Sequence, residues 1–169
     1  MSVRALIGLG ANLGQARETI ERALEGLKNT PGIEALEVAP FYGSDPVDAQ
    51  GPTFVNTVAC IQTHLAPLAL LDVLQALERA HGRERSFRNA PRTLDLDLLW
   101  YEEVAMETTR LTLPHPRMHE RAFVLQPLND LMPELVLKQG NMAQLLAQCS
   151  QRFDEKARAL RSDARQPKR

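Results

Sequence analysis

The chain has 169 residues, 44% of them hydrophobic and 24% charged, and a formal net charge of -1 at pH 7. This composition is typical of one globular domain with a substantial core, and it argues against general nucleic-acid binding, which usually needs a large positive surplus. No stretch approaches the roughly 18 uncharged apolar residues of a membrane span, and Arg4 precedes the first apolar run, which is unlike a signal peptide. We therefore expect a cytoplasmic protein.

The first half of the chain predicts strands and helices in alternation. Residues 3–10 form a short aliphatic strand that ends in glycines, and a helix follows, with a buried face running from Ala16 to Leu27. Residues 33–41 are expected to form a second strand. Residues 42–52 are rich in glycine and proline and predict a long irregular loop, which in a compact domain is often functional.

A strand over residues 54–63 and a helix over about 67–80 come next. The helix periodicity predicts a buried apolar face and a solvent-facing polar side. The expected buried residues are Leu70, Val73, Leu74 and Leu77, and the expected exposed residues are Asp72, Gln75, Glu78 and Arg79.

The second half is expected to hold a strand at about 93–101, a return segment at 111–113, and helices at 120–131 and 142–150. The element order strand, helix, strand, strand, helix, strand is that of a ferredoxin-like α+β sandwich, in which helices cover one antiparallel sheet. We expect a single domain over residues 1–169, with a core at about 3–150 and a charged tail at 151–169 that has no functional role.

Asp95 and Asp97 are the first candidate site. Strand alternation places both carboxylates on one face and the neighbouring leucines on the other. At roughly 7 Å, with an effective dielectric constant of about 20, their repulsion costs on the order of 2 kcal/mol unless a cation lies between them. Mg²⁺ suits such ligands, because it prefers one or two carboxylates together with substrate phosphates. The alternative is an ordinary polar strand face.

An arginine-rich loop leads directly into these aspartates. Arg83, Arg85, Arg88 and Arg92 occur within ten residues. Guanidinium groups match phosphate oxygens, so arginines beside metal-binding carboxylates indicate a polyphosphate substrate. Taken alone, the loop is equally typical of a solvated surface or of an RNA contact.

Two further segments offer polar and aromatic groups beside rigid or loop-rich backbone. Prolines stiffen the chain around His115, and Arg121 and Phe123 follow at an expected helix start. Phe54 and Asn56 share one strand face, where a ring and an amide could stack on and hydrogen-bond to a heteroaromatic ring. Taken singly, the phenylalanines are more typical of a core and the histidine of a surface.

The glycines at 8, 10 and 14 do not form a nucleotide-binding signature. Gly14 lies one place too late for the dinucleotide fingerprint, and the chain contains no Gly-Lys-Ser/Thr sequence of a P-loop. We expect backbone geometry to be the reason for these glycines.

Taken together, four motifs resemble the 6-hydroxymethyl-7,8-dihydropterin pyrophosphokinases of folate biosynthesis, over about residues 5 to 138. The motifs are Gly8-x-Gly10-x-Asn12-Leu13-Gly14, Phe54-Val55-Asn56, Arg92-Thr93-Leu94-Asp95-Leu96-Asp97 and Leu113-Pro114-His115-Pro116-Arg117-Met118-x-x-Arg121-x-Phe123. The resemblance implies a ferredoxin-like fold and transfer of the pyrophosphoryl unit of ATP to the pterin hydroxymethyl oxygen, with release of AMP and dependence on Mg²⁺. Its small-molecule substrates would be ATP and the hydroxymethyl-dihydropterin, and we expect a monomer.

The resemblance also implies roles for individual residues. Asp95 and Asp97 would hold two Mg²⁺ ions, and Arg85 and Arg92 would act with them in catalysis. The expected nucleotide contacts are Gln75, Glu78, Arg85, Arg92, the backbone of Leu98, Arg110, Thr112, His115 and Arg121. The expected pterin contacts are Ser44, Asp45, Val47, Phe54, Asn56 and Phe123.

Two other functions fit parts of the same pattern. A ferredoxin-like domain with an arginine loop could be an RNA-recognition module, but no strand has the expected pattern of basic and aromatic residues. Another phosphoryl or nucleotidyl transferase on the same scaffold is the second alternative, and release of AMP or of ADP distinguishes it.

Overall fold

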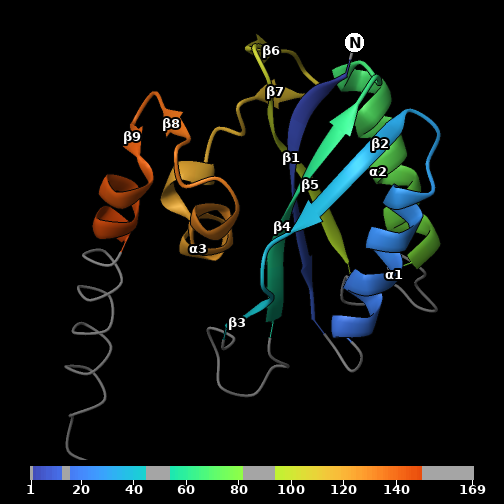
Figure 1. Ribbon diagram of the computed structural model, residues 1–169, viewed down its shortest axis with the longest axis horizontal. Coiled ribbons are helices and arrows are strands. Elements are labelled where there is room, and N and C mark those ends of the chain that lie inside the picture. The colour runs from blue at the N-terminus through green and yellow to red at the C-terminus, as the bar shows by residue number, and fades with distance from the viewer. Residues whose placement is uncertain (1, 13–15, 45–53, 82–93, 150–169) are drawn as a thin grey trace, which may run out of the picture.

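The computed structural model describes residues 2–12, 16–44, 54–81 and 94–149 (Figure 1). Within these ranges, strands alternate with helices largely as the sequence predicts. The elements are β1 (Val3–Ala11), α1 (Ala16–Lys28), β2 (Ile33–Val38), β3 (Tyr42–Ser44), β4 (Phe54–Thr63), α2 (Pro67–His81), β5 (Asp95–Tyr101), β6 (Met106–Glu107), β7 (Thr112–Leu113), a 3-10 turn (Met118–Glu120), α3 (Ala122–Leu131), β8 (Val136–Leu137) and β9 (Gly140–Asn141). Residues 142–149 form a further helix.

The main sheet has the strand order β2-β4-β1-β5, with β3 paired to the start of β4. Each of these pairs is antiparallel. Two helices connect the first four long strands, which is the ferredoxin-like α+β arrangement. The predicted fold class is therefore confirmed.

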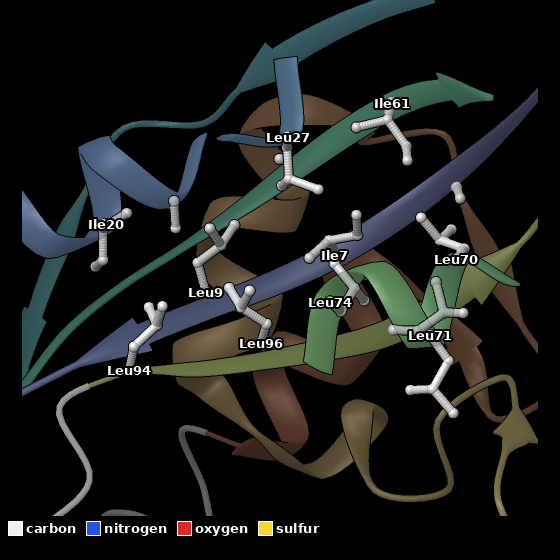
Figure 2. Packing of buried hydrophobic residues seen from close by; sticks show 14 of the residues in the cluster. Ile7, Leu9, Ile20, Leu27, Ile61, Leu70, Leu71, Leu74, Leu94 and Leu96 are labelled. Atoms are coloured by element: carbon white, nitrogen blue, oxygen red, sulfur yellow. The ribbon is translucent and has the colours of Figure 1, made fainter. Parts of the chain in front are cut away.

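One face of the sheet packs against α1 and α2 (Figure 1). Figure 2 shows the interdigitation of Ile7 and Leu9 of β1 with Ile20 and Leu27 of α1 and Leu74 of α2. These five side chains have at most 2% of their surface exposed. Burial of each such side chain contributes about 1.5–3 kcal/mol, so this face anchors the sheet.

The opposite face meets α3 and the helix at 142–149, which lie across the sheet from α1 and α2 (Figure 1). Leu6, Val58 and Leu99 join the cluster on this side. Further along β1, Gly10 pairs with Asn56 on one neighbour and with Asp95 on the other. Because directly paired residues project to the same face, the polar groups predicted for the site share the α3 side of the sheet.

Some predictions about local structure are wrong. The second strand ends at Val38, and the predicted loop at 42–52 begins with a strand, β3. Gly8 and Gly10 lie inside β1 without a positive φ, so unusual backbone angles do not explain them. A Cβ on Gly10 would lie 2.8 Å from Oδ1 of Asn56, so the close approach of that side chain is the reason for glycine there.

The polar side of α2 also differs from the prediction. Glu78 is buried, whereas Val73 and Leu77 are only partly buried. Over the part of the chain that the structure describes, no helix combines the length and the apolar character needed to cross a membrane. The charged tail at 151–169 lies outside the described residues.

Candidate active site

Asp95 and Asp97 project from β5 on the face opposite to α1 and α2. Leu94, Leu96 and Leu98 are each at most 5% exposed and join the core, whereas Asp97 is exposed and Asp95 is half-buried. The predicted alternation is confirmed. The strand is held firmly by its leucines, so the two carboxylates have a rigid support.

Glu78 supports the same strand from α2. Its carboxylate accepts a hydrogen bond of 2.8 Å from the backbone N–H of Leu96, the residue between the two aspartates. A buried carboxylate needs such donors, because burial without hydrogen bonds strongly disfavours the charged form. The periodicity could not reveal this contact, since the partner of Glu78 is a backbone group on a strand 18 residues away.

Asn56 and Phe54 lie near one end of β4, on the face that carries the aspartates. Asn56 is 8% exposed and its amide packs over Gly10, whereas Phe54 is 38% exposed. Interpreting Phe54 as an ordinary core residue is therefore wrong. An exposed ring beside a buried amide can stack on a flat heterocycle and hydrogen-bond to its edge.

Phe123 and Arg121 lie at the start of α3. Phe123 is 43% exposed, so it too is not a core residue, and the guanidinium carbon of Arg121 lies 5.7 Å from the centre of its ring. Arg121 is the N-cap residue of the helix. Both side chains are therefore placed by the same helix terminus.

His115 is held in one orientation by the backbone around it. The backbone N–H of His115 donates to the carbonyl of Leu99 at 2.7 Å. The ring nitrogen Nδ1 accepts from the backbone N–H of Arg117 at 3.1 Å. A ring nitrogen that accepts carries no proton, so the neutral ring carries its proton on Nε2 and can donate from there.

The charge state of His115 depends on its surroundings. Burial is the main cause that lowers the pKa of His115, Asp97 opposes this shift, and the positive charges of Arg121 and Arg117 add to it. The carboxylate of Asp97 and the guanidinium group of Arg121, the N-cap residue of α3, are thus two of the charges that influence the pKa of this ring.

Arg110, Gln75 and Thr112 come from three places in the chain: the bend before β7, α2 and β7. Arg110 Nη2 donates to Asp72 Oδ1 at 2.7 Å and to Gln75 Oε1 at 3.3 Å. Thr112 belongs to β7, and Leu98 is buried in β5, where it pairs with Ile7 of β1. The structure therefore brings together Arg110 and Gln75, two of the residues expected to contact the nucleotide.

Not every predicted site residue can be placed. Ser44 ends β3 and pairs with Phe54. Asp45, Val47, Arg85 and Arg92 lie outside the described residues, and the arginine-rich loop does so as a whole.

The carboxylates of β5 fit a hard divalent cation. Among the described residues, no group of three or more His, Cys, Asp or Glu side chains forms a protein-only metal cage. Two same-face carboxylates are the donor set that Mg²⁺ uses when substrate phosphates complete its coordination. The chemistry of Asp95 and Asp97 thus suits a metal shared with a polyphosphate.

Three contacts near the site were not predicted. Asp72 binds Arg110, and the hydroxyl of Tyr42 donates a short hydrogen bond to Asp130. Glu78 binds the backbone of β5, as described above. Each joins elements far apart in the chain, and no local sequence pattern signals such partners.

The fold and this cluster define a ferredoxin-like α+β protein with a polar site on the α3 side of its sheet. A family profile described as 7,8-dihydro-6-hydroxymethylpterin-pyrophosphokinase (HPPK) matches residues 6–133. The chain belongs to this family. It is accordingly an enzyme of the diphosphotransferase class.

Known relatives agree with this assignment. The chain is 48% identical over 151 residues to the 2-amino-4-hydroxy-6-hydroxymethyldihydropteridine pyrophosphokinase of Pseudomonas aeruginosa, which covers 88% of this chain and 93% of the relative. It is 42% identical over 136 residues to the Haemophilus influenzae protein of the same name, covering 80% and 85%.

Solved structures show the same fold. The HPPK-DHPS protein of Plasmodium falciparum, crystallised with pteroate, superposes with a TM-score of 0.72 at 13% identity over 94% of this chain. The present chain spans 44% of that protein. At this level of identity, the likeness concerns the fold alone.

Proposed function

We propose that the chain transfers the pyrophosphoryl unit of ATP to the hydroxymethyl oxygen of 6-hydroxymethyl-7,8-dihydropterin, forming the pterin diphosphate and AMP. The observation that carries this proposal is the shared face of the sheet. Asp95 and Asn56 flank the same residue, Gly10, on the two neighbouring strands. Groups suited to a metal-bound phosphate and groups suited to a flat heterocycle are therefore adjacent.

In this proposal, Asp95 and Asp97 hold two Mg²⁺ ions. When bound, these ions neutralise charge on the triphosphate and help to orient its oxygens. The residues of the chain then have separate tasks. The neutral ring of His115 donates a hydrogen bond from its Nε2–H to a phosphate oxygen, and Arg121 supplies positive charge close by.

The arginine loop supplies the remaining phosphate contacts in this proposal. Arg85 and Arg92 would bind the phosphates together with Arg121, as the resemblance to the family implies. Arg110 and Gln75 would bind the nucleoside end, with Thr112 and the backbone of Leu98. Their present contacts support this, because Arg110 donates to Gln75 at 3.3 Å and Gln75 is held by α2. Glu78 has a different part, since its carboxylate holds the backbone of β5.

The pterin is proposed to lie between Phe54 and Phe123. The exposure of both rings supports stacking, and the buried amide of Asn56 offers one donor pair and one acceptor to the edge of the heterocycle. The backbone of Ser44, Asp45 and Val47 would complete the pocket. Transfer then requires the attacking hydroxymethyl oxygen and the β-phosphorus to meet between the two halves of the site.

The test is an assay in which AMP formation is followed with ATP and hydroxymethyl-dihydropterin, with and without Mg²⁺. The proposal expects AMP only when both substrates and the metal are present. Release of ADP would indicate an ordinary kinase reaction instead. Formation of AMP at the same rate without the pterin would contradict the proposed acceptor.

Three wider expectations belong to the proposal. We propose that residues 1–169 act as one catalytic domain and as a monomer, in the cytoplasm. Cys60 and Cys149 are not joined in a disulfide, which supports a reducing compartment. Light scattering at assay concentrations tests the oligomeric state, and a mass twice that of the chain would contradict it.

A further inference from the structure

The hydrogen bond between Tyr42 and Asp130 joins two parts of the molecule that are 88 residues apart in the chain. Tyr42 is the first residue of β3, and Asp130 lies in the last turn of α3. Its hydrogen bond to Asp130 is the main cause that raises the pKa of Tyr42. The hydroxyl therefore stays protonated and donates to the carboxylate throughout the neutral pH range.

β3 is a short strand of three residues. Among the residues that the structure describes, its strand pairing is with Phe54, Val55 and Asn56 of β4. A strand of this length makes few backbone hydrogen bonds, so its position is weakly determined by the sheet. A side-chain contact to a helix adds a second, independent anchor.

The same two elements carry the groups proposed to bind the pterin. Tyr42 pairs directly with Asn56, so both side chains project to the face that α3 covers. On α3, Phe123 and Asp130 are seven residues apart, and two helical turns place them on the same side of the helix. The hydrogen bond thus ties the strand beside Asn56 to the helix side that carries Phe123.

Leu125 and Leu128 lie on the adjoining face of α3 and are buried against the sheet. Their packing holds the helix on the sheet. Apolar packing tolerates small rotations of a helix, whereas a hydrogen bond to one hydroxyl specifies a direction. The bond between Tyr42 and Asp130 supplies that direction at the end of α3 away from Phe123.

We propose that Tyr42 and Asp130 are a positioning pair for the pterin: their hydrogen bond sets the position of Phe123 relative to Phe54 and Asn56. The inference rests on the proposed function. Neither residue touches the substrate in this proposal, because each acts through the element that it holds. The pair determines affinity for the heterocycle and leaves the nucleotide half of the site unaffected.

The experiment compares Tyr42→Phe, Asp130→Ala and the double variant with the unmodified protein. Each change removes one partner of a hydrogen bond whose net contribution corresponds to about a three- to tenfold effect. We expect the KM for hydroxymethyl-dihydropterin to rise by about this factor in each single variant. The KM for ATP stays within about twofold of its original value, and the double variant is no worse than either single variant.

Asp130→Asn and Tyr101→Phe are the controls. Asp130→Asn retains an acceptor for the hydroxyl, so it restores most of the pterin affinity that Asp130→Ala loses. Tyr101 is the second tyrosine of the chain, and its hydroxyl donates to the carbonyl of Leu65 at 2.7 Å. Tyr101→Phe therefore makes the same chemical change outside the proposed pair, and it should leave the KM for the pterin unchanged.

The outcomes separate the two levels of inference. If the unmodified protein forms no AMP with the pterin, the proposed function fails. If it does, but the variants keep their pterin KM, raise both KM values alike, or lose affinity additively in the double variant, the positioning pair is overturned. A pterin-specific rise shared by the single and double variants, with recovery in Asp130→Asn, supports it.

Discussion

Replacement of Gly10 by alanine perturbs the proposed pterin pocket by one methyl group. The new Cβ would lie 2.8 Å from Oδ1 of Asn56, which is closer than such atoms approach, so the amide must move. Asn56 is 8% exposed and has little room to do so. Loss of its hydrogen-bonding geometry leaves buried polar groups unpaired, at a cost of about 1–3 kcal/mol.

Gly8→Ala is a matched control on the same strand. The two glycines are two residues apart and face the same side, but a Cβ on Gly8 would meet only the side chain of Leu99, at 3.4 Å. Both substitutions reduce the freedom of the unfolded chain, which stabilises the protein by about 0.4–1 kcal/mol. Gly8→Ala is therefore expected to keep or slightly raise the melting temperature.

Gly10→Ala is expected to lower the melting temperature by about 2–4 °C for each kcal/mol of net loss. It should also weaken pterin binding about tenfold or more, while ATP binding without pterin stays within about twofold. Thermal unfolding and titration calorimetry with each ligand measure the two effects. If Gly8→Ala and Gly10→Ala behave alike, the clash with Asn56 does not control the pocket and the reasoning is wrong.

Further substitutions test the two aspartates, Glu78 and Asn56. Asp97→Ala, and likewise Asp95→Ala, should retain the circular dichroism spectrum of the folded chain but lower Mg²⁺-dependent turnover at least about a thousandfold, because metal-based charge stabilisation contributes several kcal/mol; near-normal turnover would exclude the metal assignment. Glu78→Ala should lower the free energy of unfolding in urea by about 1–3 kcal/mol, because the Leu96 N–H loses its partner, whereas Glu78→Gln keeps an acceptor and most of the stability; equal losses would show that charge, not the hydrogen bond, is what matters. Asn56→Ala should weaken pterin binding by about ten- to a hundredfold in calorimetry and leave nucleotide binding alone; equal weakening of both ligands, with a large fall in melting temperature, would make Asn56 a structural residue.

The sequence predicts the fold and the faces of its strands well, because both depend on short-range periodicity. Leu94, Leu96 and Leu98 are buried and Asp95 and Asp97 face away from them, as alternation requires. The same argument correctly places Phe54 and Asn56 on one face. The pairing of β4 and β5 with β1 then brings these side chains close to one another. The motifs of the family indicate which chemistry the two strands share.

The sequence does not predict contacts between residues that are far apart in the chain. Glu78 was expected on the exposed side of its helix, but a backbone N–H of β5 provides a hydrogen bond that makes its burial favourable. β3 was missed because three residues are too few to show alternation. Gly10 illustrates the same limit, because a side chain on the neighbouring strand leaves no room for a Cβ at this position.

The environment of β5 agrees with the proposed need for cations from outside the strand. Among the described strands, β5 lies at the end of the sheet order, so the N–H of Leu96 finds its partner in Glu78 rather than in another strand. That partner is a third carboxylate, next to a residue flanked by two aspartates. Carboxylates on one short strand repel a phosphate anion, by on the order of 2 kcal/mol for two charges at roughly 7 Å and an effective dielectric constant of about 20. In the proposed reaction, a polyphosphate would therefore approach this strand together with metal ions and arginines, and the carboxylates around Leu96 would make nucleotide binding depend on the metal.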